Sequence, residues 1–180
     1  TATKRFTMKY GNLHFGLVHP VKVATIVIGM LIGETVAAQD FDRGVESYLE
    51  GDYQSALHEF QVLAENGDAG AQHLLGQMFR RGAGVPQDFS EAMKLWKLSA
   101  DQGYVEAQYT LGVMYYYGAY GVPEDHVQAL AWLNLTVAQG VEDARPLWHS
   151  LHAQLSPEQV AEAQELSLQW QVNSDQHDTN

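Results

Sequence analysis

One pattern constrains the fold of this chain more than any other: part of the sequence repeats. When Ala56, Ala92 and Ala129 are aligned, the spacing is 36 residues and then 37 residues. AQHLLGQMFRRGAGVPQD at residues 71–88 matches AQYTLGVMYYYGAYGVPED at residues 107–125, and the second stretch contains one extra residue. Agreement at so many fixed offsets indicates consecutive copies of one structural unit that stack on each other.

Apolar residues within a copy follow the period of an α-helix. One stripe of the third copy, at i, i+4, i+7 and i+8, consists of Ala107, Leu111, Met114 and Tyr115. Between the helical stretches, Gly103 and Gly140 can take the left-handed conformation that ends a helix. Gly-Val-Pro at residues 84–86 and 121–123 forces a bend, and the Asp two residues after each Pro can cap the next helix. Each copy is therefore predicted to contain two helices.

These residues resemble the Sel-1-like repeat family, relatives of the tetratricopeptide repeat. The matching motifs are A-x-x-W, A-x-Q-G, A-Q-x-x-L-G-x-M-[FY] and G-x-G-V-P with a following Asp. VQALAWLNLTVAQG at residues 127–140 is typical of bacterial members, and the resemblance covers roughly residues 40–171. It implies an all-α, right-handed α-solenoid of about four helix-turn-helix repeats.

The domain prediction for residues 39–171 is a solenoid of unequal units. In the second unit, the Trp of the family's aromatic pair is shifted by one position to Trp96. In the fourth unit, Pro146 predicts a helix start near Asp143, because Pro is tolerated only in a first turn. Ser156-Pro157-Glu158-Gln159 is a strong start signal for a last, capping helix, and a disordered tail is expected at 172–180. The predicted units are 40–66, 68–102, 104–139 and 142–171.

Residues 1–38 are interpreted as a leader with a signal peptide at 8–38, cleaved after Ala38. VATIVIGMLIG at residues 23–33 carries no charge and is preceded by basic residues. A run of this length suits the roughly 7–15 residues of a signal-peptide core better than the about 20 of a membrane span. An uncleaved anchor or a buried core helix is the alternative. We expect a periplasmic or secreted protein of a Gram-negative bacterium, which meets the membrane only through this segment before cleavage.

Composition excludes several classes of site. The chain has no Cys, which excludes disulfides, thiolate zinc sites and cysteine catalysis. Its formal net charge of −12 argues against nucleic acid as a partner, since phosphate binding needs a basic face. His149 and His152 are spaced i, i+3, but a metal site needs further ligands and none is evident at suitable spacing. We therefore predict no catalytic residues, no cofactor and no metal.

The resemblance implies instead a concave groove lined by the first helix of each pair. Carried over residue by residue, the groove candidates are His73, Gln77, Arg80, Glu106, Tyr109 and Tyr116. Arg80 has a second interpretation, because positive charge at the end of a helix is favoured by the helix dipole. Tyr115 continues the core stripe, so Tyr116 or Tyr117 is expected to be exposed.

The predicted function is a non-enzymatic adaptor or scaffold that holds a protein or peptide in this groove. No catalytic motif accompanies the predicted concave surface. The alternative is a cell-wall protein that binds or hydrolyses peptidoglycan or β-lactam, as some cysteine-rich relatives suggest. Those relatives depend on repeated cysteines, which this chain does not have.

Overall fold

A computed structural model of the protein describes residues 40–177, which form helices and turns without a strand. The predicted leader at 1–38, with its cleavage site, lies outside the described residues. No helix in the described part combines the length and the apolar character that a membrane crossing needs.

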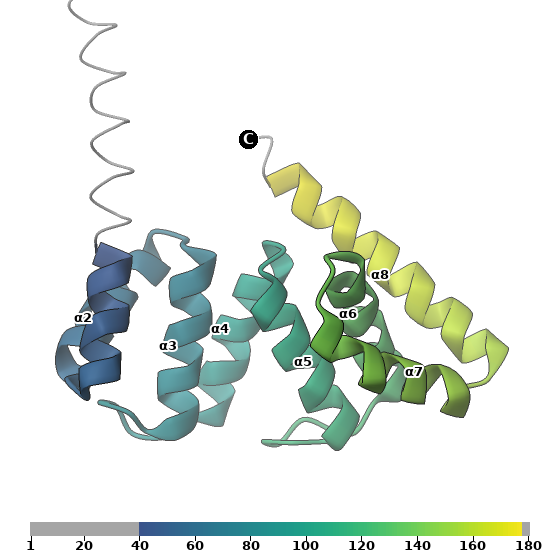
Figure 1. Ribbon diagram of the computed structural model, residues 1–180, viewed down its shortest axis with the longest axis horizontal. Helices are drawn as coiled ribbons and strands as arrows, with labels where there is room; N and C mark the ends of the chain where they lie inside the picture. The colour runs from purple at the N-terminus through teal and green to yellow at the C-terminus, as the bar shows by residue number, and fades with distance from the viewer. Residues whose placement is uncertain (1–39, 178–180) are drawn as a thin grey trace, which may run out of the picture. The chain divides into compact units, whose positions relative to one another are not determined.

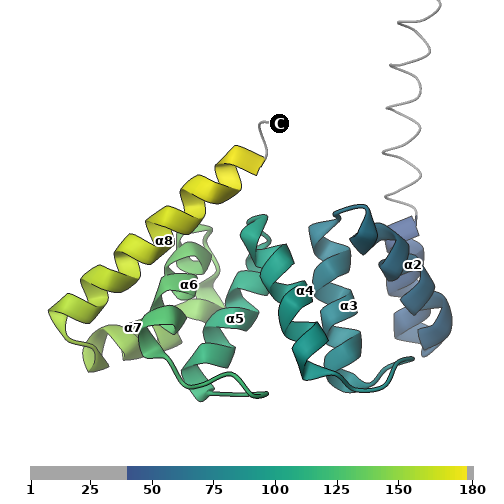
Figure 2. The same ribbon diagram turned by 180° about the vertical axis from the view of Figure 1, so that it is seen from behind.

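The described helices follow one another in chain order (Figure 1). The same succession is visible from behind in Figure 2. A helical segment at residues 40–50 comes first. The later elements are α2 (Tyr53–Glu65), α3 (Ala69–Arg81), α4 (Phe89–Asp101), α5 (Val105–Tyr117), α6 (His126–Ala138), the 3-10 turn η1 (Glu142–Ala144), α7 (Arg145–Gln154) and α8 (Pro157–His177). From α2 to α7 each helix contacts the next, whereas α8 returns to contact α6.

The predicted helix boundaries have the expected chemistry. The Asp88 carboxylate accepts the backbone N–H of Glu91 at 3.0 Å, which caps α4. Ser156 and Gln159 form a reciprocal box at the start of α8, with N–H donors 3.3 and 3.0 Å from the opposing side-chain oxygens. Gly103 follows α4 with φ +84°, in the left-handed region predicted for it.

α8 extends beyond residue 171, where the predicted repeat domain ends. The helix continues through residue 177, and only residues 178–180 lie outside the description. Residues 172–177 contain neither Gly nor Pro. Once a helix is nucleated, each further residue adds a backbone hydrogen bond at low cost, so polarity alone does not end it.

A polar link joins neighbouring units and is used twice. The Gln72 side chain donates to the Ala64 carbonyl at 3.2 Å and accepts from Gln102 Nε2 at 2.8 Å. One unit later, the Gln108 side chain donates to the Ala100 carbonyl at 3.3 Å and accepts from Gln139 Nε2 at 2.8 Å. Because Gln72 and Gln108 are buried, these bonds satisfy groups that would otherwise be costly to desolvate.

The shifted Trp96 takes the place that Leu133 holds in the next unit. Trp96 lies against Gly76 of α3, as Leu133 lies against Gly112 of α5. The Trp96 indole N–H also donates to the His73 carbonyl at 3.2 Å. The aromatic shift therefore places an indole in one unit where the next unit has a leucine.

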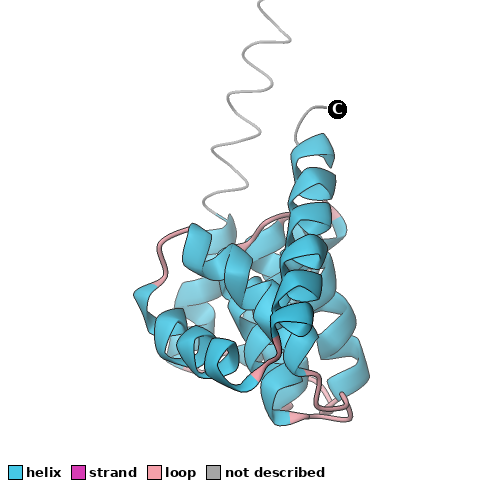
Figure 3. Cartoon of the chain, turned by 90° about the vertical axis from the view of Figure 1, so that its right-hand side faces the viewer, coloured by secondary structure: helices cyan, strands magenta, loops and turns pink. Residues whose placement is uncertain are grey.

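The last helix packs against α6. In Figure 3 it is the helix that leads to the C-terminus, in front of the others. Trp170 of α8 stacks on Trp132 of α6, with ring centroids 4.0 Å apart. Ala163 of α8 is fully buried in the same region. α8 therefore caps the apolar surface that α6 would expose, in agreement with its predicted role.

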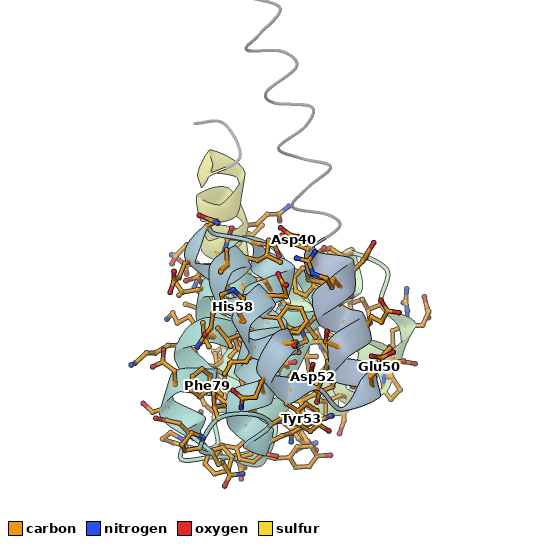
Figure 4. All side chains as sticks on the ribbon, turned by 90° about the vertical axis from the view of Figure 1, so that its left-hand side faces the viewer. Asp40, Glu50, Asp52, Tyr53, His58 and Phe79 are labelled. Carbon is orange, nitrogen blue, oxygen red and sulfur yellow. The ribbon has the colours of Figure 1, made fainter. Side chains whose placement is uncertain are left out.

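At the opposite end of the described residues, the loop of the second unit contacts the first unit. Asp52 and Tyr53 lie at the turn into α2 (Figure 4). The Gln54 side chain donates to the Gly84 carbonyl at 2.9 Å, and Arg81 donates to the Tyr48 hydroxyl at 2.7 Å. The Gly-Val-Pro loop is thus a contact between units as well as a bend.

Candidate functional site: a groove between α3 and α5

Two adjoining hollows lie between α3 and α5, the first helices of the second and third units. Their volumes are about 340 and about 200 Å³. They share Gln77, Tyr109 and Thr110, so they form one continuous groove. The larger hollow is completed by His73, Val105, Glu106, Val141 and Asp143, and the smaller by Arg80, Trp96, Val113, Met114 and Tyr120.

The groove contains five of the six candidates predicted from the sequence. His73, Gln77 and Arg80 recur at i, i+4 and i+7 on α3, which explains why one face of that helix presents all three. Glu106 and Tyr109 face them from α5. The geometry brings these side chains together; their role in binding stays a prediction.

Tyr116, the sixth candidate, lines neither hollow. Its ring stacks on His126, with centroids 5.2 Å apart, and meets Tyr117 edge-on at 4.8 Å. Tyr117 is the exposed tyrosine of the run, at 66%. Tyr116 is the third unit's equivalent of Arg80, but its neighbours place it outside this groove.

Sequence reasoning missed Thr110, Tyr120 and Asp143 as groove residues. Thr110 follows Tyr109 on α5, and Asp143 belongs to η1 of the next unit. Tyr120 is the extra residue of the third copy, so the insertion itself was the signal that pointed to it. The direction in which that loop projects could not be read from the repeat.

A chain of polar contacts runs along the α3 side of the groove. The Thr110 hydroxyl donates to the Glu106 carbonyl at 2.7 Å, which leaves its oxygen to accept from His73 Nε2 at 3.3 Å. Arg80 Nε donates to Gln77 Oε1 at 3.0 Å. These bonds hold the groove side chains in place before any partner arrives.

Burial determines the charge state of His73. Desolvation lowers the pKa of its imidazole, and the nearby Glu106 carboxylate only partly opposes this effect. The ring also packs on Tyr104, whose phenol pKa is raised by burial and then by Glu106. His73 is therefore neutral at pH 7 and contributes hydrogen bonds to the groove instead of positive charge.

Tyr120 forms one end of the groove in an unusual backbone conformation. With φ +58°, it is the one non-glycine residue of the described part in the left-handed region. Its ring stacks on Phe89, with centroids 4.6 Å apart, and its hydroxyl accepts from Arg80 Nη1 at 3.3 Å. Tyr120 of the third unit thus contacts the second unit and orients the Arg80 guanidinium.

Within the described residues, no three His, Asp or Glu side chains gather as metal ligands. His149 and His152 instead lie against Trp148, with centroids 4.9 and 3.9 Å from its ring.

Comparison with known proteins identifies the repeat. The family model of the Sel1 repeat matches residues 69–104 and 105–141, the two units that build the groove. Comparison with curated proteins gives no match. The predicted resemblance is therefore confirmed at the level of the repeat.

Two solved structures have the same architecture. One is a protective antigen present in uropathogenic Escherichia coli strains that displays an SLR fold, with 27% identity and a TM-score of 0.68 over 79% of this chain. The other is a Sel1 repeat protein from Oxalobacter formigenes, with 24% identity and a TM-score of 0.58 over 74% of this chain. This chain covers 32% and 54% of their lengths, respectively. The predicted all-α solenoid is confirmed.

Proposed function

We propose that this Sel1-repeat protein is a non-enzymatic interaction module that holds a segment of a partner protein in the groove between α3 and α5. Sel1-repeat proteins are generally scaffolds for protein interaction. The observation that carries the proposal is the groove itself, which two consecutive units line with apolar walls and oriented polar groups. Its volume suits a few side chains of an extended segment.

Tyr109 is the expected anchor, because it lies where the two hollows meet. Tyrosine combines a large apolar surface with a polar tip and is enriched among residues that dominate binding energy. Gln77 and Thr110, which also line both hollows, offer hydrogen bonds beside it. The groove therefore has a central anchor flanked by polar contacts.

Tyr109→Ala tests this function against a matched control. The purified chain is used to capture partners from bacterial extract, and the affinity of the captured partner is then measured. We expect Tyr109→Ala to weaken binding by more than about 2 kcal/mol, which is about 30-fold. Tyr117→Ala removes an exposed tyrosine of the same helix that lies outside both hollows, and binding should be unchanged. Equal losses in the two variants, or no loss in Tyr109→Ala, would refute the groove as the binding site.

We also propose that the protein is exported, a proposal supported by the sequence of residues 1–38 alone. The experiment is N-terminal sequencing of protein recovered from the periplasm or medium. A chain beginning at Gln39 is the expected result. An intact N-terminus on protein that stays in the cytoplasm would contradict it.

A further inference from the structure

The two ends of the groove carry opposite charges in a chain that is acidic as a whole. At one end, Arg80 is held by Gln77 and by the Tyr120 hydroxyl, which are both neutral acceptors. Within the described residues, Arg80 forms no ion pair with a carboxylate. Its guanidinium is therefore oriented but not neutralised, and it can still donate to an anionic group.

The other end holds two exposed carboxylates, Glu106 and Asp143, which come from different units. The ion pairs of the described part leave both of them without a Lys or Arg. His73 beside Glu106 is neutral at pH 7, as argued above, and supplies no compensating charge. This end therefore favours a cationic group.

Along α3, the groove is about as long as a short stretch of extended chain. From His73 to Arg80 the α3 helix advances seven residues, which is about 10 Å at 1.5 Å per residue. A polyproline II chain repeats every three residues and rises about 9 Å over them, so i and i+3 face the same side. Tyr109 and Val113 lie between the ends and provide an apolar wall for the intervening residues.

We propose that the groove recognises an extended partner segment in which an acidic and a basic side chain are three residues apart and flank apolar residues. The acidic side chain binds Arg80, and the basic side chain binds Glu106 and Asp143. This inference rests on the proposed function and specifies the partner's chemistry. It also assigns Tyr120 as a positioning residue, which holds the guanidinium through its hydroxyl.

Four-residue peptides test the charge pattern directly. Ac-Glu-Pro-Pro-Lys-NH2 and Ac-Lys-Pro-Pro-Glu-NH2 present the same charges in opposite orders, and Ac-Gln-Pro-Pro-Gln-NH2 presents none. Binding is followed by amide chemical shifts of the full chain, which report contacts near Tyr109 and Thr110. We expect one charged order to bind about fivefold more tightly than the other, because exposed ion pairs contribute only modestly to binding. The uncharged peptide should bind more weakly than the preferred order.

A charge-swapped variant keeps the test independent of any general loss of folding. It carries Arg80→Glu, Glu106→Lys and Asp143→Lys, and it should prefer the opposite peptide order. A misfolded protein can lose binding but cannot reverse a preference. Arg81→Glu is the control, because Arg81 contacts Tyr48 and lies outside both hollows; its peptide preference should equal that of the native chain.

Three results would overturn the inference: no binding of any peptide, no preference between the two orders, or an unreversed preference in the swapped variant. Failure of the charge rule can be distinguished from failure of the proposed function. If partner capture depends on Tyr109 but ignores the charge swap, the groove binds a partner and the charge rule is wrong. If neither change affects capture, both proposals fail.

Discussion

The bend loops of the second and third units differ by one residue and contact their neighbours in different ways. In the second unit, Gly84 lies so close to the start of α2 that an added Cβ would be 2.8 Å from the Tyr53 carbonyl oxygen. In the third unit, the matching Gly121 faces open space, and the inserted Tyr120 contacts the preceding unit through Phe89 and Arg80.

The two loops differ in what they contribute to the groove. The shorter loop joins units through backbone, so it shapes the stack without adding a groove residue. The longer loop joins them through a side chain that also ends the groove. The inserted residue thus adds a side chain to the groove, and its backbone takes the strained left-handed conformation.

The largest expected effect comes from the two loop glycines. Both have positive φ, so Ala is strained at either position, but only Gly84 also faces backbone atoms at close range. We expect Gly84→Ala to lower the free energy of unfolding by about 3 kcal/mol and Gly121→Ala by about 1 kcal/mol. Urea denaturation of the two variants measures this. Equal losses would show that the loops pack alike.

A second pair of glycines sharpens the comparison of the two cores. An added Cβ at Gly76 would lie 2.7 Å from the Trp96 indole nitrogen, whereas at Gly112 it would meet the more adaptable Leu133 side chain at 2.9 Å. We expect Gly76→Ala to cost about 2 kcal/mol, since the indole cannot move without losing its bond to His73. Gly112→Ala should cost less than about 1 kcal/mol, because Ala also favours the helix. Thermal unfolding of both variants measures this. A larger loss of stability in Gly112→Ala than in Gly76→Ala would contradict it.

Replacing the inserted residue separates its two roles. Tyr120→Gly relieves the left-handed strain but removes the stacking on Phe89, so the free energy of unfolding should change by less than about 1 kcal/mol. Binding of the preferred charged peptide should weaken by about threefold, because Arg80 loses its anchor. Tyr120→Phe, which keeps the ring, should weaken peptide binding with native-like stability. Full peptide affinity in both variants would remove Tyr120 from the site.

The smallest expected effect is a pH dependence of stability in the His73 region. Since burial lowers the pKa of His73, the unfolded chain binds a proton more readily than the folded chain. The folded state should therefore lose stability as the pH falls below the ordinary histidine pKa of about 6.5, and the loss should level off below the folded pKa. His73→Gln should flatten this part of the stability profile, which is measured by urea denaturation at a series of pH values. A steeper profile in His73→Gln would reverse the assigned sign.

The sequence predicted the helical pairs well because their signals are local. Capping Asp residues, left-handed glycines and the apolar stripe that includes Leu111 all act within a few residues of each other. The α3 side of the groove was predicted from the family resemblance, and the helical period keeps those positions on one face of α3. Tyr116 and Tyr120 were harder, because their neighbours are set by the loop of the third unit, which no periodic rule describes.

The last helix extends beyond the end that the sequence predicts for the repeat domain. A polar composition suggested that order ends at residue 171, but α8 continues to His177. Composition reports whether a segment is able to bury apolar surface, whereas a helix already anchored through Trp170 can extend without doing so.

Site-specific photo-cross-linking tests the central claim that a partner lies in the α3–α5 groove. A photoreactive phenylalanine analogue replaces either Tyr109 within the groove or Tyr117 outside it on the same helix. We expect a cross-linked partner segment from position 109 and none from position 117. Cross-linking from position 117 alone, or equally from both, would contradict it.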